Sequence, residues 1–120
     1  MSAPQLTLNL VEGSVSFRFN PEAARDLQGA IAALMQSLKA IASKTPGGGK
    51  ATPHKSMEYQ YAGEVFLECF CNPNIWPSPF AAKVLLTIRD DRIRLTTEAE
   101  LTRIVEDLNT FLDLHHASTF

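Results

Sequence analysis

Apolar and polar residues alternate near the start of the chain, and helical spacing follows. Residues 5–11 and 14–19 alternate on either side of a turn at 12–13, which predicts a β-hairpin. Asn20 and Pro21 are residue types that begin helices, the first as the cap and the second in the first turn. The predicted helix has one apolar stripe, made of Ala24, Leu27, Ile31, Leu34, Met35, Leu38 and Ile41.

The C-terminal part has the same order of patterns. Residues 82–88 and 93–95 alternate around an acidic turn at 90–91, which predicts a second hairpin. Residues 97–100 have the spacing of a capping box that opens a helix. Its stripe consists of Leu101, Ile104, Val105, Leu108, Phe111 and Leu112. Because Leu8–Met35 is echoed by Leu86–Leu112, we expect two ββα units related by a pseudo-repeat.

Two further segments lie between these units. Residues 57–72 continue the alternation and predict one long strand, bent at Gly63. Residues from about 44 to 56 are rich in Gly and Pro and lack apolar periodicity, which predicts a flexible loop. The expected fold is therefore α+β: a two-layer sandwich, ββα-β-ββα, in which an antiparallel sheet of about five strands carries both helices on one face.

Composition sets the class of protein. A chain of 120 residues with 45% hydrophobic and 20% charged residues is typical of a globular protein with a single domain over residues 1–120. The net charge of −2 argues against DNA as a partner, since DNA-binding domains carry an excess of Lys and Arg. No apolar run is long enough to cross a membrane, and the sequence from Met1 shows no signal peptide, so we expect a cytoplasmic protein.

The predicted sheet leaves one face without a helix, and most residues on that face are polar. Phe66, Phe70 and Leu85 are exceptions, and clustered apolar residues on a surface are typical of an interface. A homodimer that packs sheet to sheet would bury them. Alternatively, the Pro-rich loop that contains Trp76 and Phe80 folds back over them.

The same face is also expected to carry basic residues. Arg89, Arg92 and Arg94, together with Phe66 and Phe70, are the residue types with which sheet proteins bind single-stranded RNA. Acidic residues on this face would repel phosphate and argue against RNA; these are Glu58, Glu64 and Glu68.

Candidate chemistry elsewhere in the chain is sparse. Cys69 and Cys71 form a C-x-C on a strand, which is not the spacing of a zinc site and is too close for a disulfide, so we expect buried free thiols. The histidines, at 54, 115 and 116, supply no second metal-binding pair. The run at 47–50 lacks the context of a phosphate loop. We therefore predict no catalytic, cofactor-binding or metal-binding residue.

A ligand site is the alternative from another class of function. Tyr59, Tyr61, Trp76 and His54 would combine apolar walls with a few polar groups, as small-ligand or enzymatic pockets do. Such a site would lie between the sheet and the Pro-rich loop.

The run from Ile93 to Thr97 that leads into Leu101–Leu112 resembles the C-terminal part of small uncharacterised proteins of cyanobacteria and plastids. This resemblance implies a photosynthetic cell and an accessory role in building or regulating a larger complex. From the residues, the favoured hypothesis is a non-catalytic protein–protein binding or assembly protein, acting through the open sheet face as a homodimer. The interface candidates are Phe66, Phe70, Trp76, Phe80, Leu85, Arg89, Arg92 and Arg94.

Overall fold

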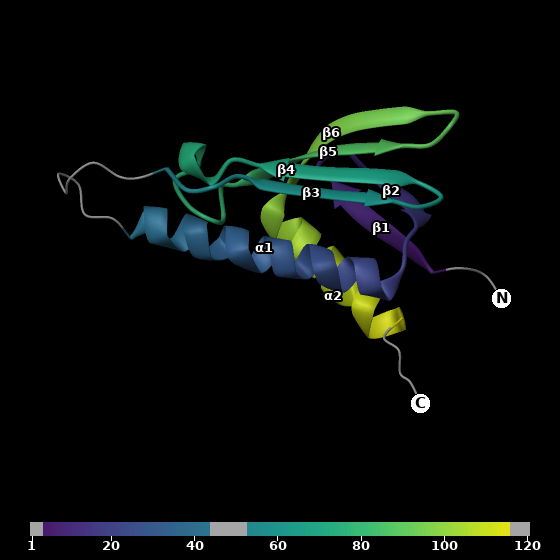
Figure 1. Cartoon of the computed structure of the whole chain (residues 1–120), viewed down its shortest axis with the longest axis horizontal. Helices are drawn as coiled ribbons and strands as arrows, with labels where there is room; N and C mark the ends of the chain where they lie inside the picture. The colour runs from purple at the N-terminus through teal and green to yellow at the C-terminus, as the bar shows by residue number, and fades with distance from the viewer. Residues whose placement is uncertain (1–3, 44–52, 116–120) are drawn as a thin grey trace.

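A computed structural model of the chain describes residues 4–43 and 53–115 (Figure 1). The fold is α+β, and its helices and antiparallel strands follow one another along the chain without a parallel crossover. In chain order the elements are β1 (Gln5–Leu10), β2 (Gly13–Arg18), α1 (Pro21–Ala42), β3 (Met57–Ala62), β4 (Phe66–Cys71), the short 3₁₀ helix η1 (Pro73–Ile75), β5 (Lys83–Arg89), β6 (Arg94–Glu100) and α2 (Leu101–His115).

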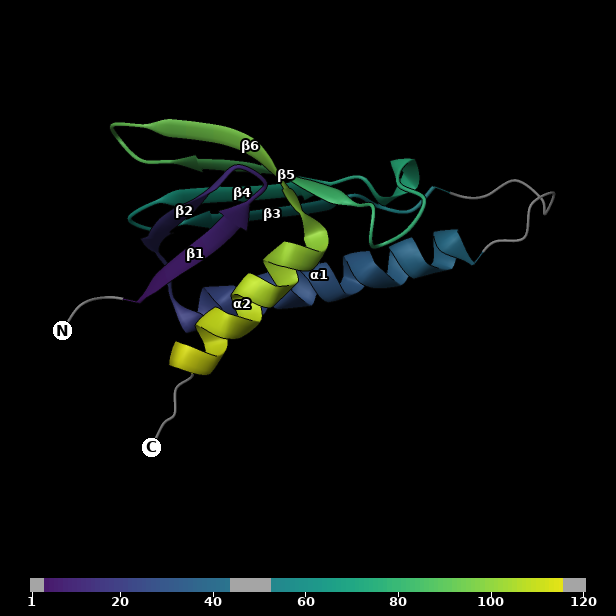
Figure 2. The same ribbon diagram turned by 180° about the vertical axis from the view of Figure 1, so that it is seen from behind.

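The strands form two antiparallel sheets, so the predicted single sheet of about five strands is wrong. Within the described residues β1 pairs with β2 alone, and the other sheet has the order β3-β4-β5-β6. Both helices lie on one side of the four-stranded sheet and leave its other side bare (Figures 1 and 2). Along this inner side α1 contacts β3, while α2 contacts β1 and β6.

The single long strand predicted at 57–72 is also wrong, because this segment is a hairpin. β3 and β4 pair with each other, with Tyr61 opposite Leu67 and Ala62 opposite Phe66. The turn is closed by a hydrogen bond from the Gly63 backbone N–H to the Val65 carbonyl, at 3.2 Å. A Cβ on Gly63 would collide with the Tyr61 ring, so the close approach in this turn favours glycine.

The second helix begins later than its predicted capping box implies. Residues 97–100 belong to β6, which runs directly into α2 at Leu101. The Leu101 N–H donates to the Ala82 carbonyl at 3.1 Å, and the residues of the expected box pair with β5 instead. The predicted pseudo-repeat is likewise not confirmed, since the first hairpin is a separate sheet and the second is part of the larger one.

The start of α1 and its buried face are confirmed. The Asn20 Oδ1 accepts a hydrogen bond from the Ala23 N–H at 2.7 Å, and Pro21 occupies the first turn, where a missing N–H costs nothing. The buried residues of the helix are Ala23, Ala24, Leu27, Ile31, Leu34 and Leu38.

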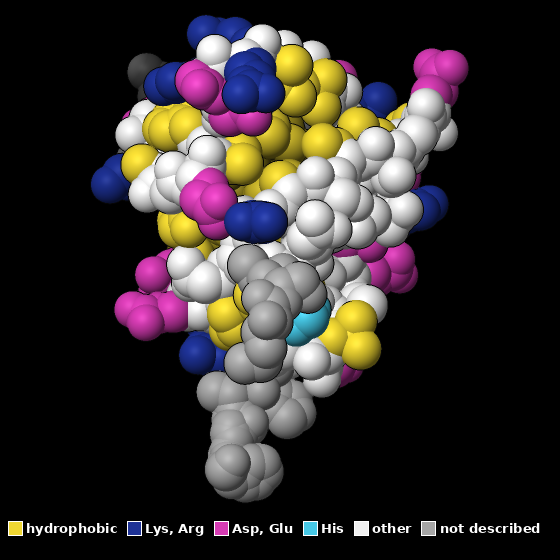
Figure 3. Space-filling view, turned by 90° about the vertical axis from the view of Figure 1, so that its right-hand side faces the viewer, with side chains coloured by type: hydrophobic (Ala, Val, Ile, Leu, Met, Phe, Trp, Pro, Cys, Tyr) yellow, Lys and Arg dark blue, Asp and Glu magenta, His cyan; other side chains and the backbone are white. Residues whose placement is uncertain are grey.

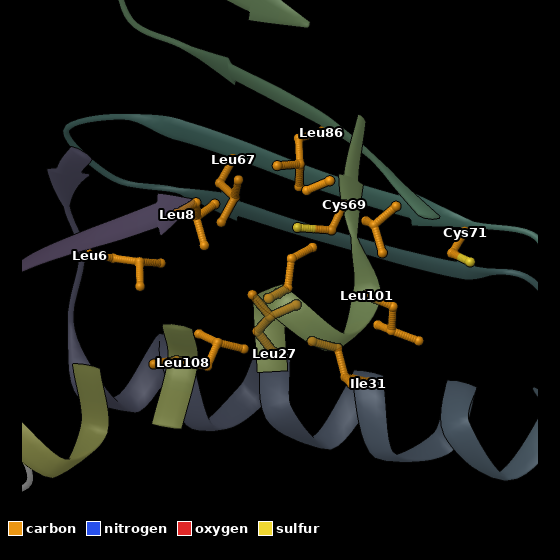
Figure 4. Packing of buried hydrophobic residues seen from close by; sticks show 14 of the residues in the cluster. Leu6, Leu8, Leu27, Ile31, Leu67, Cys69, Cys71, Leu86, Leu101 and Leu108 are labelled. Atoms are coloured by element: carbon orange, nitrogen blue, oxygen red, sulfur yellow. The ribbon is translucent and has the colours of Figure 1, made fainter. Parts of the chain in front are cut away.

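The core lies between the helices and the inner side of the four-stranded sheet (Figure 4). Leu67 and Cys69 of β4 face α1 and α2. Residues Leu6 and Leu8 of β1 close one end of this layer. The hairpin β1–β2 therefore belongs to the same core as the larger sheet, although no ladder joins the two in residues 4–43 and 53–115.

A polar contact fixes β1 to α2. Asp107 is 9% exposed, and its two carboxylate oxygens accept from the Asn9 backbone N–H at 2.7 Å and the Asn9 Nδ2 at 2.8 Å. Each oxygen of the buried carboxylate thus accepts a hydrogen bond, which offsets the cost of burying the charge. This contact links two residues that stand almost a full chain length apart.

The loop predicted at about 44–56 lies mostly outside the described residues, which resume at Pro53. In the described part, the backbone N–H of His54 donates to the Asn74 Oδ1, and the His54 carbonyl accepts from the Asn74 Nδ2, both at 2.8 Å. The entry into β3 is therefore fixed to η1.

Candidate functional site

The side of the four-stranded sheet that turns away from the helices is called the outer face below. Strand register arranges its side chains in three rows across β3, β4, β5 and β6. The first row is Glu58, Phe70, Leu85 and Glu98; the middle row is Gln60, Glu68, Thr87 and Thr96; the third row is Ala62, Phe66, Arg89 and Arg94.

The first row gives the outer face an apolar end. Phe70 and Leu85 are direct cross-strand neighbours and are 37% and 43% exposed. Together with Ile75, which is 67% exposed, and Trp76, they line a hollow of about 170 Å³. The charged side chains of Lys83 and Glu98 are also part of its lining. The apolar end thus combines a shallow concavity with a charged rim, as interfaces do.

The third row gives the outer face a basic end. The Arg89 guanidinium lies 4.4 Å from the centre of the Phe66 ring, and Arg94 is the residue directly opposite Arg89 on β6. Like charges opposite each other destabilise strand pairing. Figure 3 looks onto the end of the molecule with the β3–β4 and β5–β6 turns, where Lys and Arg side chains border a group of hydrophobic ones.

The turn at this end is held by Asp90. Its Oδ1 accepts from the backbone N–H groups of Arg92 at 2.8 Å and Ile93 at 2.9 Å. The N–H groups of Ile93 and Arg92 hold the pKa of the Asp90 carboxyl below its usual value. Asp90 therefore serves the backbone of this turn, and Arg92 is exposed beside it.

The middle row is polar and partly covered. The Gln60 Nε2 donates to the Glu68 Oε2 at 2.8 Å, and Glu68 is half-buried between Phe66 and Phe70 on its own strand. Thr87 is 7% exposed even though it lies on the outer face, because its neighbours cover it.

The structure brings together most of the interface residues that the sequence predicts. Phe66, Phe70, Leu85, Arg89 and Arg94 lie on the outer face, and Trp76 lies at its apolar end. Arg92 is in the adjoining turn. Phe80, by contrast, is 86% exposed and does not line the hollow, so the Pro-rich loop reaches the apolar end through Ile75 and Trp76.

Three residues at the apolar end were not among the predicted interface residues: Ile75, Lys83 and Glu98. The sequence did contain a signal for Glu98. Leu95, Thr97 and Ala99 face inward and continue the alternation of a strand, so Glu98 between them faces outward. Of the three acidic residues expected on the outer face, Glu64 forms an ion pair with a residue outside that face. Glu64 pairs with Arg18 of β2, at 3.1 Å.

The residues proposed for a ligand pocket are dispersed. The Tyr59 hydroxyl donates to the Ala23 carbonyl at 3.1 Å, and the Tyr61 hydroxyl accepts from the Asn20 Nδ2 at 3.2 Å, both beside α1. Burial raises the pKa of Tyr59. Trp76 instead borders the outer face. A larger apolar groove, of about 330 Å³, lies between α1 and α2 and is lined by residues that include Ile31, Met35 and Leu108.

Cys69 and Cys71 are buried free thiols, as the sequence predicts. Burial, with a smaller contribution from the nearby Glu68 charge, raises the pKa of the Cys69 thiol to about 12. Burial also raises the pKa of Cys71, and a hydrogen bond with Trp76 opposes that rise. Both thiols are protonated at neutral pH and poor nucleophiles.

We expect both cysteines to react with a thiol reagent such as DTNB much more slowly in the folded protein than in the unfolded chain. Near pH 8 the Cys69 rate should fall by roughly two to three orders of magnitude, because only the thiolate attacks and burial makes it scarce. The absorbance of the coloured product that the reagent releases, followed with and without guanidinium, measures both rates. Equal rates in the two conditions would contradict the burial of these thiols.

Within the described ranges, no three His, Cys, Asp or Glu side chains are grouped closely enough to hold a metal ion. His115 stacks against Phe111, with ring centres 4.9 Å apart, and His116 lies outside the described residues. Neither α1 nor α2 is long and apolar enough to span a membrane. Searches of protein-family models and of curated proteins found no match to this chain.

Proposed function

We propose that this chain is a non-catalytic protein-binding protein that acts through the outer face of its four-stranded sheet and does so as a homodimer. The observation that supports this most directly is the pair Phe70 and Leu85, which are adjacent, exposed and continuous with the hollow beside Trp76. Aromatic and aliphatic side chains that are grouped in this way contribute most of the binding energy when a partner covers them.

The rim of the apolar end fits the same proposal. Glu98 stands at the β6 edge of the row that contains Phe70 and Leu85, and both Glu98 and Lys83 line the hollow. A hydrophobic centre within a charged rim is the usual anatomy of a protein interface. A second antiparallel sheet can pack on such a face at a separation of about 10 Å, with the two sets of strands nearly aligned.

Catalysis has weaker support. The cysteine thiols, the most nucleophilic groups in the chain, are buried with raised pKa values. The Tyr59 hydroxyl is held by the Ala23 carbonyl. An accessory role in a larger complex, in which the outer face carries the contact, agrees with the arrangement of these groups.

Replacing Phe70 with glutamate should dissociate the homodimer. A charge at the centre of a desolvated contact should weaken self-association by about 30-fold or more, the size of a typical hot-spot loss. Light scattering coupled to size-exclusion chromatography, over a dilution series, measures the change.

The matched control is Phe80→Glu, since Phe80 is highly exposed and lies away from the hollow. It should leave the dissociation constant unchanged. A wild-type protein that is monomeric at every concentration, and whose mass Phe70→Glu does not alter, would show that the homodimer is wrong.

A further inference from the structure

We propose that the second copy lies on the outer face across a two-fold axis that runs perpendicular to the strands, so that Glu98 of each copy pairs with Arg94 of the other. This inference rests on the homodimer proposed above and adds its symmetry and its charge contacts. Homodimers of this kind use the same patch on both copies, so the patch must be complementary to itself.

The three rows of the outer face show this self-complementarity. The two-fold axis lies between the two sheets, crosses the strands and passes along the middle row. It places the first row of one copy on the third row of the other, and it places each strand over the same strand of the other copy. Phe70 then lies over the second copy's Phe66, on β4. On β5, Leu85 lies over the alkyl part of the second copy's Arg89, and apolar surface commonly packs against arginine stems in this way.

On β6 the same operation places a carboxylate over a guanidinium. Glu98 is in the first row and Arg94 in the third, so two symmetric Glu98–Arg94 pairs form between the copies. Within one copy the two residues are four positions apart on a strand, or about 13 Å, which is too far for an ion pair. In residues 4–43 and 53–115 the one salt bridge is Arg18–Glu64, so neither Glu98 nor Arg94 is in an ion pair there.

The basic end supplies a second argument. Arg94 lies directly opposite Arg89, and this like-charge pair disfavours the β5–β6 ladder. A carboxylate that arrives from another copy relieves that repulsion. The first row provides such a carboxylate at the matching distance from the axis, in Glu98.

The charges on the outer face also disfavour the other way of aligning the two sheets, in which the two-fold axis runs parallel to the strands. An axis parallel to the strands would place the first row on itself in reverse order, with Glu58 of each copy over Glu98 of the other. Juxtaposed like charges across an interface disfavour that partner orientation. The axis perpendicular to the strands replaces these two repulsions with two attractions, and it places Glu58 over Ala62.

The proposed axis has one unfavourable contact. Glu68 of the middle row would lie close to Glu68 of the other copy near the axis. Within its own copy, Glu68 accepts a hydrogen bond from Gln60. Removal of this charge should therefore tighten the dimer. An axis parallel to the strands would place Glu68 over Thr87, where the same change would have little effect.

The test is a charge exchange between copies, measured by sedimentation equilibrium on full-length protein. Glu98→Arg and Arg94→Glu should each weaken self-association by about tenfold or more, because each creates two like-charge contacts. An equimolar mixture of the two variants should restore association, since each charge then meets its opposite. The double variant in one chain should associate like the wild type.

Two further variants distinguish the axes. Glu68→Gln should strengthen the dimer, and Glu58→Lys, the matched control in the same row as Glu98, should leave it unchanged. Circular dichroism melts establish that each variant is folded. If Phe70→Glu dissociates the dimer but the mixture shows no recovery, or if Glu58→Lys tightens it, the proposed axis is wrong and the interaction through the outer face still holds. A wild-type monomer would overturn both.

Discussion

Replacing Leu27 with alanine should lower the free energy of unfolding by about 2–5 kcal/mol, through lost burial and the cavity left behind. Leu27 is 1% exposed and lies where α1 meets α2 beneath the four-stranded sheet (Figure 4). Small domains are stable by only about 5–15 kcal/mol, so the loss would be a large fraction of the total. Urea denaturation, followed by far-ultraviolet circular dichroism, measures it.

Leu114→Ala is the matched control for this experiment. Leu114 lies on α2 and is 73% exposed, so the same chemical change should have a small effect on stability. A Leu27→Ala variant that is destabilised no more than Leu114→Ala would contradict the core in which α1 is packed against the sheet.

Replacing Asp107 with alanine should cost about 1.5–3 kcal/mol, the usual range for a lost hydrogen bond to a charged group together with the donors it leaves unsatisfied. The two bonds from Asn9 connect β1 to α2, and in the part of the chain that the structure describes no ladder connects the β1–β2 sheet to the larger one. The loss should therefore be concentrated in the first hairpin. Hydrogen exchange should show β1 and β2 amides losing protection before those of β4 and β5.

Asp107→Asn and Asn9→Ala complete a test of this contact. Asparagine keeps one acceptor oxygen and should be intermediate between wild type and Asp107→Ala. In a double-mutant cycle, Asn9→Ala should have a smaller effect when Asp107 is already alanine, because their side-chain contact is then absent. Additive effects would show that Asp107 stabilises the protein by another route.

Local patterns predicted those elements whose stability depends on local chemistry. Asn20 and Pro21 predicted the start of α1 because a cap acts within one turn of its helix. The turn at Asp90 was predictable for the same reason, since its carboxylate accepts from residues two and three positions ahead. Side chains could also be assigned to the outer face, because alternation along a strand decides which of them point outward.

The β3–β4 hairpin was missed because its turn preserves the phase of alternation. Three residues separate Ala62 from Phe66, so odd-numbered residues face inward on both strands. The apolar pattern therefore continues through the turn as if one strand were present. Gly63 was the available signal, but it is compatible with a bend as well as a reversal, and the antiparallel pairing of β3 with β4 decides for the reversal.

Pairing between distant segments could not be predicted. Asn9 and Asp107 stand 98 positions apart, and nothing local to either residue indicates the other. The same limit applies to the candidate site. Glu98 was assigned to a capping box, because a Thr-x-x-Glu spacing fits both a cap and a strand that continues to Glu100. Ladder partners on β5 decide between the two.

The direct passage of β6 into α2 leaves no linker at this junction to absorb a change in chain length. Most elements of the fold are joined by turns, which can absorb an inserted or deleted residue. Between Ala99 and Ile104 there is no such segment, since Glu100 ends the strand and Leu101 begins the helix. One inserted residue would rotate all of α2 by about 100° and carry Ile104 and Leu108 away from the core. Evolutionary variation in length should therefore collect in the turn at 90–93 and be absent from this junction.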